Sequence, residues 1–275
     1  MQAPRRNWIR SCTHLIVVYF IYLKIYFKTL VEYRVDTWIA VLTGGLAKAS
    51  GLIFIGVIFQ RIPKLAGWSL YELLFIYGLA TTARSLNQVF LNAPFSLHSY
   101  IRRGELDTCL IRPVGTLFQV IGISQEINGL GNAVIGFFVL GYSAANLGID
   151  WTIDKAMYLF IAIVSSVLIQ FAVLMIIVIP GFWVFEIRSI VYPVVWLYDF
   201  ACYPQNIFNP FVRVLLTYVF PYALGSFYPA AYLLDPVNYQ WALWGVPATA
   251  IGLSMISYVF WRYGLRHYSS ASGLI

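Results

Sequence analysis

Repeated apolar runs of about 20 residues restrict the fold of this chain more than any other feature, because that length spans a bilayer as a helix. Of its 275 residues, 60% are hydrophobic and 11% are charged, whereas soluble domains carry about 25% charged residues. The runs do not alternate apolar and polar residues as barrel strands do. Backbone polar groups in hydrocarbon must be bonded within each segment. The sequence therefore predicts an all-α integral membrane protein.

Six spans are predicted, at about residues 38–59, 69–91, 117–142, 156–185, 187–203 and 239–263. Pro180 is expected to kink the end of the fourth. Prolines divide residues 204–235 into pieces too short to span, so we expect re-entrant or interfacial helices on the extracellular side there. We predict one membrane domain over 1–275, with an N-terminal interfacial helix (1–36), a six-span bundle (37–263) and a cytoplasmic tail (264–275).

The N-terminal segment has the pattern of an amphipathic helix lying on the membrane surface. On a helical wheel its polar side chains fall within one arc of roughly 80°, and they are Arg6, Arg10, His14, Lys24, Lys28 and Glu32. A first spanning helix that tolerates a few charges remains the alternative.

The distribution of cations predicts the orientation. Six spans place both termini on one side, and assigning that side to the cytoplasm leaves only Arg61, Lys64, Lys155 and Arg213 outside. We expect a membrane protein with both termini in the cytoplasm. The formal net charge of +7 is then explained by the orientation in the membrane and by contact with anionic lipid. Nucleic acid is not expected as a partner.

A compact charged segment, residues 102–113, lies in the loop after the second predicted span. Gly104 can end a helix in a left-handed conformation, and Glu105 and Asp107 suit the first turn of the next helix. Pro113 favours the start of a further helix. The segment is therefore predicted to read helix, break, short helix, break. Mixed charge beside apolar Leu106, Leu110 and Ile111 suggests docking onto another protein. A solvated loop that only anchors topology is the alternative. The candidate docking residues are Arg102, Arg103, Gly104, Glu105, Leu106, Asp107, Leu110, Arg112 and Pro113.

Charged residues inside predicted spans form a second candidate site. Lys48, Arg84 and Glu126 are expected to face the bundle interior, an aqueous path or each other, because a charge in hydrocarbon is costly. Gln88 and Asn128 accompany them. We predict that Glu126 pairs with Arg84 or Lys48. The pair would be either a structural lock between helices or part of a polar pathway.

Signatures of enzymes and cofactor sites are missing from the sequence. It contains no G-x-x-x-x-G-K-[ST] phosphate loop, G-x-G-x-x-G, H-E-x-x-H or G-x-S-x-G motif. The three cysteines form no CxxC pair, and the three histidines lie near predicted membrane interfaces, where solvated roles are expected. We therefore expect neither catalysis nor a bound cofactor or metal in this chain.

Three stretches resemble the permease subunits of ABC type-2 export systems, particularly a bacterial subgroup. The first resembles the signature G-x-L/F-D-x-x-L-x-R-P and runs from Gly104 through Pro113 to Leu117-Phe118-Gln119. The second resembles a late Y-P…F-P…Y-P-A region and includes Tyr203-Pro204, Phe220-Pro221 and Tyr228-Pro229-Ala230. The third runs from Gly264-Leu265-Arg266-His267-Tyr268-Ser269-Ser270 to Ala271-Ser272-Gly273 and resembles a G-L-R-R-Y-x-S motif, with His267 where the family often has Arg.

The resemblance implies a bacterial inner-membrane protein with a six-span fold, an interfacial N-terminal helix, a cytoplasmic coupling helix and re-entrant extracellular helices before the last span. It also implies two copies of a separate ATPase subunit, which would bind the ATP and Mg²⁺. A second permease is implied too, favoured as a related different chain, with a homodimer as the alternative.

Two functions from other classes remain open at this point. One is a secondary transporter driven by an ion gradient, with Arg84 and Glu126 in the coupling role. The other is a membrane scaffold that recruits a cytosolic protein. The many aromatic residues are better explained by interfacial belts than by a substrate route.

Overall fold

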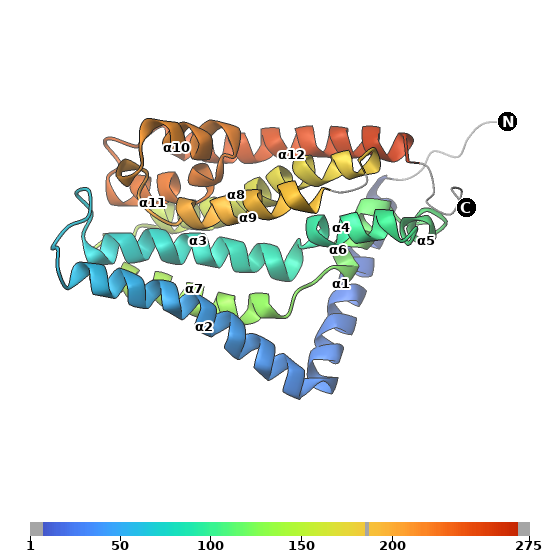
Figure 1. Ribbon diagram of the computed structural model, residues 1–275, viewed down its shortest axis with the longest axis horizontal. Coiled ribbons are helices and arrows are strands. Elements are labelled where there is room, and N and C mark those ends of the chain that lie inside the picture. Colours follow the sequence, from blue (N-terminus) through green and yellow to red (C-terminus); the bar gives the residue numbers. More distant parts are fainter. Residues whose placement is uncertain (1–7, 185–186, 269–275) are drawn as a thin grey trace.

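The computed structural model describes residues 8–184 and 187–268, with side chains described from residue 17 onward except at 188. About 80% of the chain is helical, and every regular element in the described ranges is a helix (Figure 1). The predicted all-α class is therefore confirmed. The α-helices are α1 Trp8–Glu32, α2 Arg34–Phe59, α3 Leu70–Phe90, α4 Ala93–Arg102, α5 Leu106–Leu110, α6 Thr116–Ile123, α7 Asn128–Asn146, α8 Ile153–Val178, α9 Arg188–Ala201, α10 Pro210–Val214, α11 Phe227–Leu234 and α12 Ala242–Arg266.

Three helical stretches of the described chain are long and apolar enough to cross a membrane. They are Arg34–Phe59, Ile153–Phe182 and Ala242–Arg266, and the bent pair α6 and α7 would make a fourth. The 21-residue α3 is more polar, but most of its side chains are buried among other helices. The membrane character is thus supported by length and composition, and the complete six-span topology stays a prediction.

The third predicted span is not one continuous helix. The chain bends by 78° between α6 and α7, at a break that contains Gln125 and Glu126. Here the Glu126 amide donates to the carbonyl of Gln88 on α3 at 3.2 Å. This contact between distant segments satisfies a backbone group in place of a helical bond, so the predicted third span over 117–142 is broken into α6 and α7 here.

The start of α3 and the end of α8 lie close to the predicted helix boundaries. Ser69 and Glu72 form a capping box at the start of α3. Near Pro180, α8 gives way to the 3-10 turn η1, Ile179–Phe182, because proline cannot donate the α-helical hydrogen bond. The sequence did not anticipate α4, whose first turn contains Pro94, a residue favoured at helix starts.

Close helix contacts build the bundle around α3. A Cβ atom on Gly78 of α3 would lie 2.7 Å from the Leu140 nitrogen of α7, and one on Gly136 of α7 would lie 2.8 Å from the Thr82 nitrogen of α3. On its other side α7 meets α2, where Gly131 lies directly against the carbonyl of Val41. Small residues permit these backbone approaches, which side chains would prevent.

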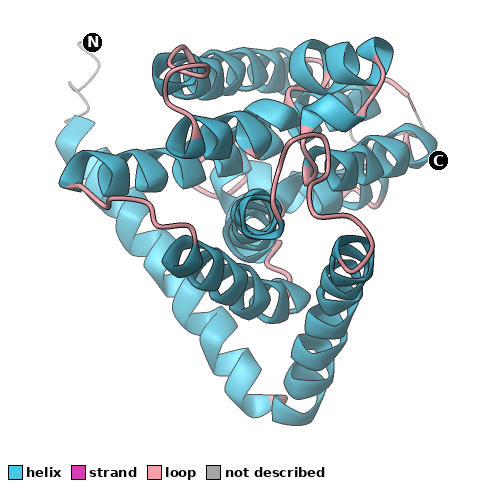
Figure 2. Cartoon of the chain, turned by 90° about the vertical axis from the view of Figure 1, so that its left-hand side faces the viewer, coloured by secondary structure: helices cyan, strands magenta, loops and turns pink. Residues whose placement is uncertain are grey.

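The helix α1 is separate from α2 and runs across the bundle (Figure 2). The bend lies at Tyr33, and the Tyr19 hydroxyl donates to the Phe90 carbonyl at 3.3 Å. Lys24, Lys28 and Glu32 are exposed, whereas Arg6 and the side chains of Arg10 and His14 lie outside the described part. The interfacial position of α1 remains a prediction.

Residues 204–235 consist of short pieces, as expected. The fifth predicted span, 187–203, contains the 14-residue helix α9, which at about 21 Å is shorter than the roughly 30 Å core of a bilayer. It is followed by η2 (Gln205–Ile207), α10, the π-helical η3 (Leu215–Val219), η4 (Tyr222–Gly225) and α11. The start of α1 and the end of α12 lie at the same end of the bundle as α5 (Figure 1).

Candidate functional site

The charged segment 102–113 forms a turn and a short helix at one end of the bundle. Helix α4 ends at Arg102, Gly104 has φ +68°, and α5 follows from Leu106 to Leu110. The positive φ is the left-handed conformation that glycine adopts readily. The predicted order of helix, break, short helix and break is therefore confirmed.

Buried contacts fix α5 to the bundle. Leu106 is fully buried and Cys109 nearly so. The Gln119 amide of α6 donates to the carbonyls of Cys109 and Val114, at 2.8 and 2.7 Å. Leu106 was expected to take part in docking from an aqueous loop, and this was wrong, because its side chain is the anchor of α5.

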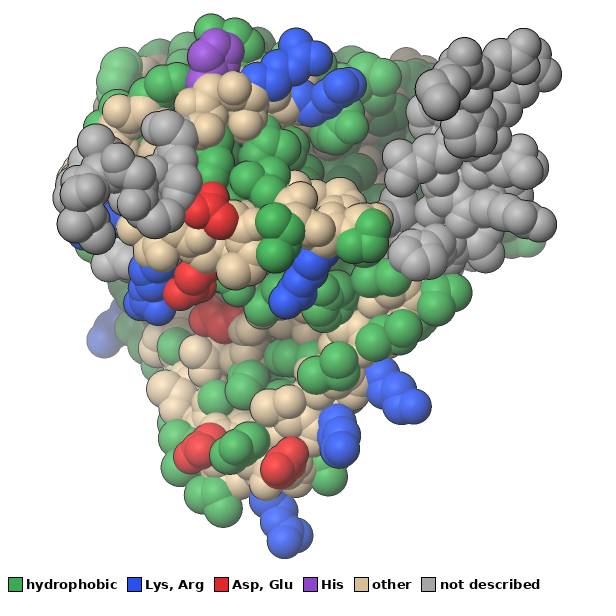
Figure 3. Space-filling model, turned by 90° about the vertical axis from the view of Figure 1, so that its right-hand side faces the viewer, with side chains coloured by type: hydrophobic (Ala, Val, Ile, Leu, Met, Phe, Trp, Pro, Cys, Tyr) green, Lys and Arg blue, Asp and Glu red, His purple; other side chains and the backbone are tan. Residues whose placement is uncertain are grey.

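The outer surface of the segment is the part available to a partner. Arg103 and Glu105 form an exposed ion pair at 3.6 Å, Leu110 is 43% exposed, and Ile111, Arg112 and Pro113 are exposed as well. Figure 3 shows cationic and anionic side chains interspersed with hydrophobic ones over this end of the molecule. A mixed surface of this kind suits recognition of another protein.

The segment also contacts the end of the last long helix. Burial, and secondarily the nearby Asp107 carboxylate, raise the pKa of Tyr268 to about 12. The Tyr268 ring packs edge-on against Phe182 of η1 at 5.8 Å. Asp107 therefore belongs to the connection between α5 and the α12 end of the bundle, which the sequence pattern did not reveal.

Lys48 and Arg84 converge on Asp199, a residue that was not predicted from the sequence. Asp199 of α9 lies 3.5 Å from Lys48 Nζ and 3.8 Å from Arg84 Nη1, both measured to Oδ1. We call Lys48, Arg84 and Asp199 the charged triad. It joins α2, α3 and α9. The only available sequence signal was a lone acid in a predicted span, the same signal that singled out Glu126.

Arg84 and its neighbours attach α9 to the bundle. The guanidinium donates to the Val195 carbonyl at 3.3 Å and stands over the Tyr198 ring, 5.1 Å from its centre. Tyr198 in turn donates to the Ala80 carbonyl at 2.7 Å and accepts from Gln170 at 3.0 Å. These bonds satisfy polar groups that water cannot reach in a membrane.

Lys48 lies near the middle of α2, about 17 Å from its end at Phe59, and α2 is long and apolar enough to cross a membrane. An unpaired charge at the centre of a spanning helix costs about 2.5–3.5 kcal/mol on insertion scales. Pairing with Asp199 offsets part of this cost.

Glu126 belongs to a different polar group, which we call the amide cluster: Gln88, Glu126, Asn128 and Asn132. The Glu126 carboxylate accepts from Gln88 at 3.5 Å and from Asn128 at 3.3 Å, and Asn132 donates to Gln88 at 2.9 Å. The predicted pairing of Glu126 with Arg84 or Lys48 was wrong, because the bend between α6 and α7 brings Glu126 beside Gln88.

A small cavity lies beside Arg84, between the two polar groups. Its volume is ≈ 20 Å³, and its polar lining includes Asn87, Gln88, Gln170 and Tyr198. That volume holds about one water molecule.

The comparison with known families agrees with this architecture. The profile of the ABC-2 family of transporter proteins matches residues 46–272, which include the charged triad, the amide cluster and the charged segment. The chain belongs to the ABC-2 transporter family. No curated protein and no solved structure matches it.

As an ABC-2 permease, the chain is a membrane transport component. The described residues contain no group of three or more His, Cys, Asp or Glu side chains placed to hold a metal ion. Cys109 and Cys202 are buried free thiols. His98, expected in solvent, is instead buried on α4 near Gly181.

The corrected pairing in this ABC-2 permease can be tested by exchanging charges. Lys48→Asp and Asp199→Lys alone each place like charges together and should lower the thermal midpoint in detergent. The double exchange restores opposite charges and should recover at least half of the loss. Exchanging Arg84 and Glu126 in the same way should give no recovery. Recovery in that second pair, and none in the first, would contradict the structure.

Proposed function

We propose that this chain is the membrane-spanning subunit of an ATP-driven exporter in the bacterial inner membrane. In this proposal, two copies of a separate ATPase bind ATP and Mg²⁺ and dock on the charged segment from the cytoplasm, where both termini also lie. A second permease, a related different chain in preference to a second copy, completes the substrate path. The observation that carries the proposal is the exposed mixed-charge surface on an otherwise buried, anchored α5.

The contacts of α5 suggest how motion in the ATPase would reach the membrane. A push on α5 would be transmitted through Leu106 to the bundle core and through Gln119 to α6. Asp107 would transmit it to Tyr268 and so to the end of α12. Rigid helices joined by packed contacts carry displacements of this kind.

The docking surface can be tested by reversing its charges without breaking its own ion pair. Arg103→Glu together with Glu105→Lys keeps a pair within the permease but inverts the pattern presented to a partner. Because both residues are exposed, we expect an unchanged thermal midpoint and a reduction of about fivefold or more in ATPase co-purification. Lys64→Glu, exposed at the opposite end, serves as the control. Undiminished co-purification and transport by the double variant would refute docking at this surface.

The ion-gradient alternative depended on a coupled Arg84–Glu126 pair. The structure places these residues in separate polar groups, so no observation favours that mechanism over ATP-driven export.

A further inference from the structure

The charged triad contains one more positive charge than negative. Lys48 and Arg84 share one carboxylate oxygen, Asp199 Oδ1, at 3.5 and 3.8 Å. Strong charge-assisted hydrogen bonds join nitrogen and oxygen at about 2.7–2.9 Å. In the described part of the chain, neither cation has another carboxylate within ion-pair distance. Among residues 8–184 and 187–268, Asp199 therefore neutralises the two cations incompletely.

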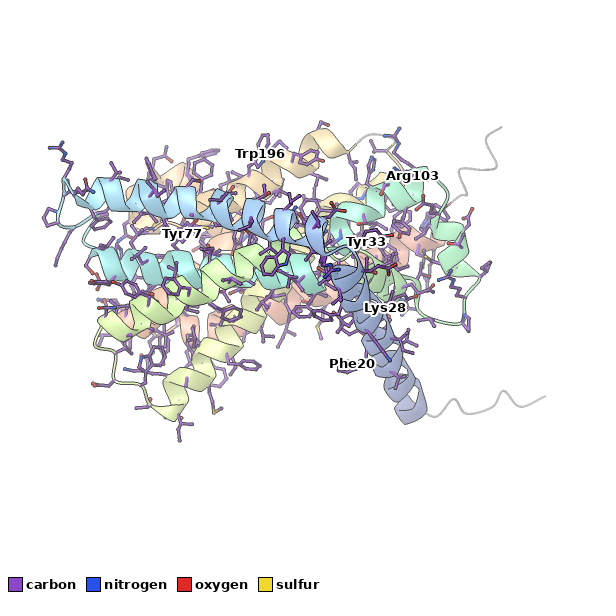
Figure 4. The ribbon with its side chains drawn as sticks, turned by 90° about the horizontal axis from the view of Figure 1, so that it is seen from below. Phe20, Lys28, Tyr33, Tyr77, Arg103 and Trp196 are labelled. Carbon is purple, nitrogen blue, oxygen red and sulfur yellow. The ribbon has the colours of Figure 1, made fainter. Side chains whose placement is uncertain are left out.

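The charged triad is accessible from outside the bundle. The Asp199 side chain is 52% exposed, while those of Lys48 and Arg84 are 19% and 18% exposed. On α9, Trp196 and Phe200 are also exposed and share a helical face with Asp199. Figure 4 shows Trp196 on the outside of the bundle. An apolar aromatic surface thus adjoins the open side of the charged triad.

The interior side offers no room for a larger ligand. The cavity beside Arg84, at ≈ 20 Å³, holds about one water molecule. A ligand that reaches the cations must therefore enter from the exposed side, past Asp199 and along α9.

We propose that Lys48 and Arg84 bind the anionic headgroup of an amphiphilic cargo, a phosphate or carboxylate carried on an apolar tail that lies along Trp196 and Phe200. Asp199 is the internal counter-ion, which occupies the cations when no cargo is bound. The net positive charge of the triad opposes a cationic ligand. The proposal rests on the proposed transport function and names the class of cargo.

A direct binding measurement tests this site, because substitutions at Lys48 and Asp199 should change the affinity for an anionic amphiphile in opposite directions. The purified complex, without ATP, is titrated with radiolabelled dodecyl phosphate in dodecyl maltoside. Lys48→Gln should weaken binding by about tenfold, because one cation is removed. Asp199→Asn should strengthen it by about threefold or more, because the competing carboxylate is removed. Lys48→Arg should retain binding, and Lys64→Gln, an exposed loop variant, should bind like the native chain.

The outcomes separate the alternatives. Tighter binding in Asp199→Asn and weaker binding in Lys48→Gln support the proposal, provided that both variants remain folded by thermal midpoint. If Lys48→Gln does not fold, the proposal is still tested by the affinities of the other two variants, which should be higher in Asp199→Asn and retained in Lys48→Arg. Equal weakening in Asp199→Asn and Lys48→Gln would overturn the proposal in favour of a structural cluster. Preferential binding of dodecyltrimethylammonium, abolished by Asp199→Asn, would overturn it in favour of a cationic cargo.

Failure of this proposal is distinguishable from failure of the proposed function. Binding is measured without ATP, so it does not depend on coupling to an ATPase. A permease that captures the ATPase but binds no anion retains the proposed function and loses only the cargo assignment.

Discussion

Gly131→Ala should destabilise the permease by about 2–3 kcal/mol, the upper part of the range for overpacking a well-packed interior. The added Cβ would overlap the Val41 carbonyl oxygen of α2 and approach its carbonyl carbon to 2.8 Å. The obstructing atoms are backbone, so no rotamer change can relieve the overlap. The helices α2 and α7 would have to separate. We expect a lower thermal midpoint in detergent and a smaller monodisperse fraction after purification.

Gly141→Ala on the same helix is the matched control. A Cβ at Gly141 meets nothing within 4 Å, and alanine favours a helix interior by roughly 0.5–1 kcal/mol over glycine. Its thermal midpoint should stay the same or rise. Equal effects of the two substitutions would show that helix propensity, and not contact between α2 and α7, controls the response.

Leu106→Ala should uncouple transport from ATP hydrolysis more strongly than any exposed substitution in the charged segment. Leu106 is fully buried, and truncating a buried leucine costs about 2–5 kcal/mol. Since α5 has only five residues, this loss exceeds what the helix can recover locally, and α5 should detach from the bundle. We expect ATP-driven transport to fall by about tenfold or more in reconstituted vesicles.

Leu110→Ala distinguishes the anchoring of α5 to the bundle from the docking of an ATPase on its exposed surface. It makes the same chemical change on the same helix, but its side chain is 43% exposed. We expect little change in the thermal midpoint and a moderate loss of ATPase co-purification. If Leu110→Ala lowers the midpoint as much as Leu106→Ala, the buried anchor is not what positions α5.

Much of the fold could be predicted because its signals are local. The second span was predicted to begin near Ser69, where α3 begins with a capping box, and Pro180 marked the end of the α-helical part of α8. Gly104 adopts the predicted left-handed conformation in the charged segment. The pattern did not reveal the bend at Glu126, because a polar stretch in an apolar run is compatible with either a helix or a break.

The candidate sites were predicted less completely, because their contacts join distant parts of the chain. The sequence alone determined a helical membrane protein with charges at Lys48, Arg84 and Glu126, since hydropathy and residue type are local properties. Only the tertiary structure decided that Lys48 pairs with Asp199, 151 residues away, and that Glu126 does not pair with either cation. The physical reason is that a charge in hydrocarbon requires a partner, whereas helix packing in three dimensions decides which residue that partner is.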